Sequence, residues 1–229
     1  MKSISIVASI ISIMIAGCGG GLENGPSSSV SSCTNITNPM YHINYFENCG
    51  NAEQPVSKGT ESSVTVWVEM DSPNTSSGKL WVDDIYLERS DMPGVNLTAN
   101  SSFENGLYEH RENAMCLSTD IACRNIVETI DSRIWSLDAT TYRSGRYSAA
   151  ADITPLGQGF QTHIFAPLIP ISGIRSGVTF KASAYVKVEG NVQIRVGIDF
   201  RDSTGAIRAV NGLILRGNTN GNWVNLSVR

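Results

Sequence analysis

The chain has 229 residues, a formal net charge of −4 and a pI near 5.4. This negative balance argues against nucleic acid or anionic lipid headgroups as partners. Only 17% of the residues are charged and 21 are glycines, which is typical of a secreted or envelope protein built from strands and turns.

Residues 1–17 have the features of a targeting segment. A cationic start and an apolar run from Ile4 to Ile15 are followed by small residues and Cys18. The run is short for a membrane span. The pattern resembles a bacterial lipoprotein signal, with an ordinary secretory signal as the alternative. The resemblance implies a lipid on Cys18 and a membrane anchor in the cell envelope (outer membrane or cell surface). The Gly- and Ser-rich stretch that follows predicts a flexible tether over residues 18–40.

Four further cysteines suit an oxidising compartment: Cys33, Cys49, Cys116 and Cys123. Four cysteines allow three disulfide pairings. The local pairings, Cys33–Cys49 and Cys116–Cys123, close the shortest loops and cost the least chain entropy. A structural metal is the weaker alternative, because no pair shows the Cys-x-x-Cys spacing.

Eight segments alternate or cluster apolar residues as strands do, and turn residues separate them. They are Ser63–Met70, Leu80–Leu87, Tyr147–Ile153, Gly159–Phe165, Thr179–Val188, Val192–Phe200, Ile207–Leu215 and Trp223–Val228. Eight short strands with regular turn signals predict an all-β fold, an antiparallel two-sheet sandwich or jelly roll.

The clearest alternation covers Val178–Val188 and Val192–Phe200. Glu189–Asn191 between them has the residues of a hairpin loop, so we expect the two strands to pair. Their apolar faces then point to the core and their polar faces to solvent. The polar face carries four candidate ligand-binding residues, Tyr185, Gln193, Arg195 and Asp199.

Several motifs occur in the order found in one family. Asn96–Gly106 reads Asn-Leu-Thr-Ala-Asn-Ser-Ser-Phe-Glu-Asn-Gly, Trp135 follows, and Ser144–Ser148 reads Ser-Gly-Arg-Tyr-Ser. Together with Phe180–Val188 they resemble family 4/9 carbohydrate-binding modules, in which the first motif is the opening strand. The resemblance implies a galactose-binding-like jelly roll that binds polysaccharide.

Modules of this family end in a hairpin with an Asp-Asp pair, which is missing after Trp223. Segments Val64–Met70 and Lys79–Leu87 look like that hairpin, placed early in the chain. We therefore expect one module over residues 41–229, in which residues 63–88 supply the missing hairpin as a circular permutation. The alternative is a remnant of a first module at 41–91 and a truncated second module at 94–229.

Sugar-binding sites need aromatic rings that stack on pyranose faces and planar polar groups that reach hydroxyls. Trp67 and Trp135 therefore join Tyr185, Gln193, Arg195 and Asp199 as candidates for a polysaccharide such as β-glucan or xylan. The alternatives are core packing for the tryptophans and a cross-strand ion pair for Arg195 and Asp199.

The family resemblance also implies a structural Ca²⁺ ion, held by Glu104 and by Asp83 or Asp84. Carboxylate oxygens are ligands that suit calcium. The alternative is that the Asp83-Asp84 pair caps a strand end in solvent.

Catalytic motifs are missing from the sequence. No spacing singles out the two carboxylates of a glycosidase, and there is no Gly-x-Ser-x-Gly, His-Glu-x-x-His or phosphate-loop pattern. We expect non-catalytic polysaccharide binding by a surface-anchored lipoprotein. The alternatives are a structural or adhesive protein-binding sandwich and the anchoring fragment of a larger glycoside hydrolase.

Overall fold

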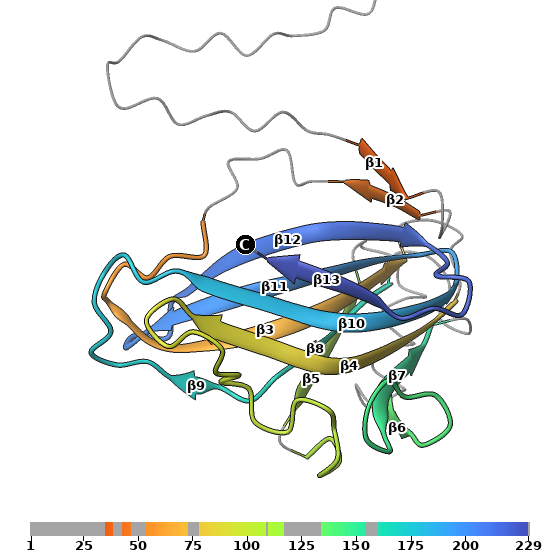
Figure 1. The fold of residues 1–229 in the computed structure, drawn as a ribbon, viewed down its shortest axis with the longest axis horizontal. Coiled ribbons are helices and arrows are strands. Elements are labelled where there is room, and N and C mark those ends of the chain that lie inside the picture. The colour runs from red at the N-terminus through yellow and green to blue at the C-terminus, as the bar shows by residue number, and fades with distance from the viewer. Residues whose placement is uncertain are drawn as a thin grey trace, which may run out of the picture. The chain divides into compact units, whose positions relative to one another are not determined.

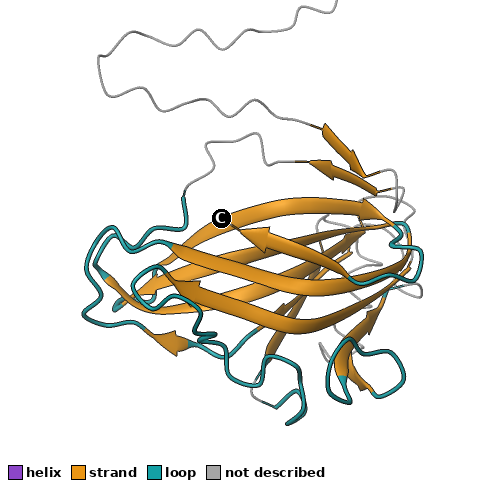
Figure 2. Cartoon of the chain, viewed as in Figure 1, coloured by secondary structure: helices purple, strands orange, loops and turns teal. Residues whose placement is uncertain are grey.

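The computed structural model describes residues 35–38, 43–46, 54–72, 78–108, 110–116, 134–153 and 160–228. All of these residues lie in strands, turns or loops (Figure 2), so the predicted all-β class is confirmed. Within the same ranges, no helix has the length and apolar character that crossing a membrane requires.

The strands form two antiparallel sheets (Figure 1). The larger sheet has the order β1-β2-β12-β11-β3-β8-β5, and β9 also pairs with β3. Its strands are β1 (Asn35–Asn38), β2 (Ile43–Phe46), β12 (Ile207–Gly217), β11 (Val192–Asp202), β3 (Glu61–Ser72), β8 (Phe160–Phe165), β5 (Arg111–Cys116) and β9 (Ile169–Pro170).

The smaller sheet has the order β13-β10-β4-β7-β6. Its strands are β13 (Val224–Val228), β10 (Phe180–Gly190), β4 (Gly78–Arg89), β7 (Ser148–Asp152) and β6 (Trp135–Asp138). Strands that follow one another along the chain often lie in different sheets, as in a jelly roll. The predicted two-sheet sandwich is therefore confirmed.

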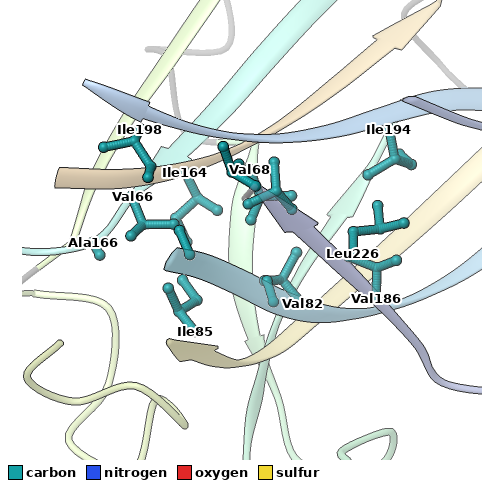
Figure 3. Packing of buried hydrophobic residues seen from close by; sticks show 14 of the residues in the cluster. Val66, Val68, Val82, Ile85, Ile164, Ala166, Val186, Ile194, Ile198 and Leu226 are labelled. Carbon is teal, nitrogen blue, oxygen red and sulfur yellow. The ribbon is translucent and has the colours of Figure 1, made fainter. Parts of the chain in front are cut away.

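The core lies between the two sheets (Figure 3). Val66 and Val68 of β3 and Ile194 of β11 approach it from the larger sheet, and Val82 of β4 and Val186 of β10 approach it from the smaller one. All five side chains are fully buried. Removing this apolar surface from water is the main stabilising contribution to the sandwich.

All eight predicted strands are present, with ends that differ by a few residues. The short strands β1, β2, β5, β6 and β9 were not predicted. In β5 the sequence Arg-Glu-Asn-Ala-Met-Cys has no alternation of apolar and polar residues, so its strand conformation depends on pairing with β8.

The expected pairing of Val178–Val188 with Val192–Phe200 is wrong. β10 pairs with β13 and β4, whereas β11 pairs with β12 and β3. The chain crosses from one sheet to the other at Gly190, whose φ of 88° suits glycine. The polar faces of β10 and β11 therefore lie on opposite outer sides of the sandwich.

The Asn96–Gly106 segment is a series of turns and not the opening strand that the family resemblance implies. It runs beside β4 through two backbone hydrogen bonds, Leu97 N to Leu87 O and Ile85 N to Ser101 O. Phe103 in this segment is fully buried with a positive φ of 60°, which breaks the regular strand geometry.

β3 and β4 occupy central positions, one in each sheet. β3 lies between β11 and β8, and β4 lies between β10 and β7. The register places Val68 of β3 opposite Val196 and Ile164, and Val82 of β4 opposite Val186 and Ala149. Both strands therefore pair on both edges with strands from later in the chain.

Several predicted features lie outside the described residues: the targeting segment 1–17, most of the tether 18–40 and the four cysteines Cys18, Cys33, Cys49 and Cys123. Within the predicted tether, Asn35–Asn38 instead form β1, which pairs with β2. Cys116 ends β5, and its side chain is not described. The lipid anchor and the disulfides remain predictions.

Candidate ligand-binding site

Polar side chains gather on the side of the larger sheet that faces away from the core, here called the outer face. Odd-numbered residues of β11 point to this side because Ile194, Val196 and Ile198 point inward. The register aligns three rows across β11, β3 and β8: Gln193–Asp71–Gln161, Arg195–Glu69–His163 and Gly197–Trp67–Phe165. β5 extends the third row with Arg111 opposite Phe165.

The middle row is a network of polar and charged side chains centred on Glu69. Arg195 donates from Nε and Nη2 to Glu69 Oε1 at 3.1 and 2.6 Å, and His163 Nε2 lies 3.0 Å from Glu69 Oε2. Burial raises the pKa of Glu69, but hydrogen bonds from His163 and Arg195 outweigh it and leave that pKa below its usual value. Glu69 is thus a buried, ionised carboxylate with both oxygens engaged.

Asp71 in the first row has weaker support. Gln193 Nε2 donates to its Oδ2 at a long 3.4 Å, and Oδ1 has no hydrogen-bond partner in the described part of the chain. Burial, helped by the charge of Glu69, raises the pKa of Asp71 to about 6. This end of the outer face therefore changes charge in mildly acidic solution.

Trp67 is buried in the outer face, and its ring is not available to stack against a ligand. Its ring lies over Gly197, where an added Cβ would come within 2.0 Å of the indole. Its Nε1 donates to Asp199 Oδ1 at 2.8 Å, and only 4% of Trp67 is exposed. The indole therefore holds Asp199 in place and cannot stack against a sugar ring in this arrangement.

An open cavity of about 590 Å³ lies at one end of the outer face, lined by Arg111, Glu112, Phe165, Asp199, Arg201 and Ile207. The Phe165 ring is half-buried and stacks on His163 with centroids 5.5 Å apart. The Arg111 guanidinium lies 5.3 Å from the same ring. Ile207, which is 54% exposed, adds apolar surface.

The charged groups of this cavity are not fully paired. Arg201 Nη2 lies 4.0 Å from Asp199 Oδ2, and Arg201 Nε has no hydrogen-bond partner among the described residues. Burial raises the pKa of Asp199, although the indole of Trp67 and the nearby Arg201 oppose this effect. The cavity therefore combines a half-buried aromatic ring with planar charged groups.

The structure does not bring the six predicted ligand-binding residues together. Asp199 lines the cavity, and Gln193 and Arg195 lie further along the same outer face. Tyr185 belongs to the smaller sheet, where the Arg143 guanidinium lies 3.5 Å from its ring centroid.

Trp135 points inward instead and donates from Nε1 to Thr162 Oγ1 at 2.9 Å. The expectation that Tyr185 shares a polar face with Gln193, Arg195 and Asp199 is wrong, because β10 and β11 belong to different sheets.

Sequence reasoning missed Phe165, Arg111 and Arg201. One signal was available in β8, where Phe165 shares the outward register of Gln161 and His163 while Thr162 and Ile164 point inward. An aromatic residue in a polar register is a marker for a binding surface. No comparable signal marks Arg111, because β5 shows no alternation.

The three predicted calcium ligands lie around one loop, residues 143–147. Asp83 is fully buried and accepts three backbone hydrogen bonds, from Asp84 N to Oδ1 and from Arg143 N and Ser144 N to Oδ2, at 2.7, 2.7 and 3.0 Å. Burial raises its pKa to about 6, although these amide bonds oppose the shift. Asp84 binds Ser144 Oγ and the Arg143 guanidinium.

Glu104 completes the loop's attachment. Its Oε1 accepts hydrogen bonds from Arg146 N and Tyr147 N at 2.7 and 3.1 Å. Gly145 has a φ of 64°, and a Cβ there would lie 2.2 Å from Glu104 Oε1. Glycine is thus required both for the backbone conformation and for the close approach of the carboxylate.

These carboxylates do not fit a calcium site in the described arrangement. N–H donors and a guanidinium occupy the positions from which a cation would be coordinated, and calcium requires six to eight oxygen ligands. In the described part of the chain, no three His, Cys, Asp or Glu side chains gather to hold a metal ion. The carboxylates serve here as anchors for the loop.

Comparison with models of known protein families, with curated proteins and with solved structures finds no match to this chain.

Proposed function

We propose that this chain binds polysaccharide without catalysis, through the cavity and the adjoining outer face of the larger sheet. The observation that carries the proposal is the open cavity, in which the half-buried Phe165 ring is flanked by Arg111, Arg201 and Asp199. An aromatic ring among planar hydrogen-bonding groups is the composition that sugar sites use.

The position of the cavity supports a chain-like ligand. It opens on a sheet face along which the partly exposed side chains of Arg195 on β11 and His163 on β8 continue. A rigid sheet holds these groups in fixed positions, so binding costs little conformational entropy in the protein. An extended polysaccharide can contact such a line of side chains with several of its sugar units.

Binding without hydrolysis is supported by the state of the two carboxylates in the cavity. Glu112 Oε2 accepts hydrogen bonds from Ile134 N and Trp135 N at 3.0 and 3.2 Å. Asp199 is held by the Trp67 indole. A glycosidase needs one carboxyl group as acid and a second one as nucleophile or base, and Glu112 is already committed to the backbone.

The test is affinity electrophoresis of the full chain, purified in a mild non-ionic detergent, through gels that contain β-glucan, xylan or an acidic polysaccharide. We expect at least one polysaccharide to retard the protein and Phe165→Ala to weaken the affinity several-fold, since stacking contributes roughly 0.5–1.5 kcal/mol. Tyr142→Ala is the control, because Tyr142 is exposed but lies outside the cavity. Migration unchanged by every polysaccharide, in a folded sample, would refute the proposal.

A second candidate is a protein-binding sandwich, and one observation favours it. Trp67, Trp81 and Trp135 are all buried, so none of the three offers its ring to a sugar. The partly exposed Arg195 and His163 on the outer face also suit a polar protein interface. Failure of all polysaccharides in the gel experiment would favour this candidate.

The proposal includes anchoring through Cys18, which the motif of residues 4–18 supports. A polysaccharide held at the sandwich would then stay close to the membrane.

A further inference from the structure

We propose that the cavity takes a negatively charged sugar unit, a uronate, whose carboxylate binds between Arg111 and Arg201 while the pyranose ring lies against Phe165. This inference rests on the proposed function and names the class of sugar. Polyuronates would therefore be preferred over neutral glucans and xylans.

The first argument is the state of Arg111. Its guanidinium lies over Phe165 at 5.3 Å, and among the described residues it has no hydrogen bond or ion pair. The residue is exposed and lines the cavity. A guanidinium has five N–H donors in a planar fork, so Arg111 keeps its donors available for a ligand.

The second argument is the neighbouring Arg201. Its side chain is 23% exposed, its closest acidic contact is the 4.0 Å approach to Asp199, and its Nε has no hydrogen-bond partner among the described residues. Burial lowers the pKa of Arg111 and the charge of Arg201 lowers it further, while the charge of Asp199 opposes both effects in part. Two like charges that face one cavity repel each other, and a bound anion would relieve that repulsion.

The acidic residues of the cavity do not remove this preference. Formally, Asp199 and Glu112 balance the two arginines, but both are already hydrogen-bonded. Asp199 Oδ1 accepts from the Trp67 indole, and Glu112 Oε2 accepts from two backbone amides. Each carboxylate keeps its charge and a second oxygen, so the preference for an acceptor-rich ligand rests on the N–H donors of Arg111 and Arg201.

A carboxylate fits these donors better than a hydroxyl group does. Guanidinium and carboxylate are both planar and form paired N–H···O bonds, which are about twice as strong as neutral ones. The Phe165 ring and the exposed Ile207 supply the apolar surface on which a pyranose face can rest. Because the whole chain carries a net charge of −4, the attraction must come from these local groups.

The experiment is a titration of the full chain in detergent with three matched ligands and two neutral references. The matched ligands are polygalacturonate, the same polymer after reduction of its carboxyl groups to alcohols, and dextran sulfate. The neutral references are β-glucan and xylan. We expect polygalacturonate to bind at least about tenfold more tightly than its reduced form, because a charged hydrogen bond contributes roughly 1.5–3 kcal/mol.

The variants locate the site. Arg111→Gln and Arg201→Gln should each weaken polygalacturonate binding about tenfold or more, and Arg111→Lys, which keeps the charge but loses the planar fork, should give an intermediate loss. Arg175→Gln is the matched control, since Arg175 is an exposed arginine outside the cavity. Thermal melting of each variant checks that the fold is kept.

Three other outcomes would contradict the assignment of a uronate as the ligand. If β-glucan or xylan binds, and polygalacturonate binds no more tightly than its reduced form, the uronate assignment is overturned and the proposed function stands. Equal, arginine-dependent binding of dextran sulfate would show a general anion site and overturn the carboxylate assignment. Binding of none of the five would overturn the inference and the proposed function together.

Discussion

Asp71 is the residue on the outer face for which burial has the clearest consequence. Its pKa is raised to about 6 from an ordinary value of 3.8, chiefly by burial and then by the charge of Glu69. The folded protein therefore holds a proton between pH 4 and pH 6 that the unfolded chain releases. Raising the pH through this window lowers stability, and a shift of about two units corresponds to at most about 3 kcal/mol.

We expect Asp71→Asn to remove this contribution, because the amide cannot ionise. The variant should gain stability relative to the wild type as the pH rises from 4 to 7, as measured by urea unfolding at each pH. Asp83, whose pKa is also raised to about 6, keeps part of the wild-type slope in both proteins. Asp91→Asn is the control, since Asp91 is exposed and its pKa is lowered by Arg89. Parallel pH profiles of wild type and Asp71→Asn would contradict the prediction.

At the scale of elements, the loop of residues 143–147 is held by carboxylates, of which Asp83 is fully buried. We expect Asp83→Ala to destabilise the protein by about 3 kcal/mol, because the amides of Asp84, Arg143 and Ser144 lose a charged acceptor. Asp91→Ala should change stability by less than about 0.5 kcal/mol, as is usual for surface pairs. Both values come from chemical denaturation.

The same loop gives an expectation for calcium. Since N–H donors already occupy the carboxylates, millimolar Ca²⁺ should leave the melting temperature unchanged. A rise of several degrees that disappears in Asp83→Ala would show that the loop rearranges around an ion, because binding to the folded state alone stabilises by mass action. That result would restore the calcium site that the family resemblance implies.

Alternation in the sequence predicted the strands well but not their partners. A period of two shows that one face of β10 and one face of β11 are buried. This alternation of apolar and polar residues is the same whether the two apolar faces lie side by side in one sheet or face each other across the core. The sequence Glu189–Asn191 is compatible with both, so sandwich packing decided the pairing.

The candidate site was predicted only in part for the same reason. Asp199 was found because it lies in a strand with strong alternation. Arg111 was not, because it reaches the cavity only through the pairing of β5 with β8. Trp67 was predicted to be a ligand-stacking residue, but the close approach of Gly197 that buries it depends on contacts across strands.

At the scale of the whole molecule, residues 54–91 link the two sheets. Without them, β11 and β8 in one sheet and β10 and β7 in the other would lose the strand that lies between them. Open edges and the loss of eight buried apolar side chains from the core cost more than the marginal stability of a domain. We expect a chain that lacks residues 54–91 to show no cooperative unfolding transition, as followed by near-ultraviolet circular dichroism.

The register along β10 indicates that residues 54–91 can be joined to the end of β13 with the fold preserved. Val228 lies opposite Ala182, and Val56 forms an antiparallel bridge with Thr179 on the same edge of β10, the edge that β4 does not occupy. Along β10, Phe180 and Lys181 lie between Thr179 and Ala182. These two positions match the two residues that precede Val56, Pro55 and Gln54, and Phe180 N donates to Pro55 O. Gln54 therefore lies where a residue following Val228 would continue β13.

A permuted chain tests this directly. It begins at Gly94, runs to Val228, joins Gln54 by a peptide bond and ends at Asp91. We expect it to fold, because β13 then runs straight into residues 54–57 with all pairings of β3 and β4 preserved. Its unfolding should be cooperative, and its melting temperature should lie within several degrees of that of a chain with the same residues in their natural order. The chain that lacks residues 54–91 is the control. A permuted chain that stays unfolded, or a deleted chain that folds, would show that the early hairpin is not an integral part of this sandwich.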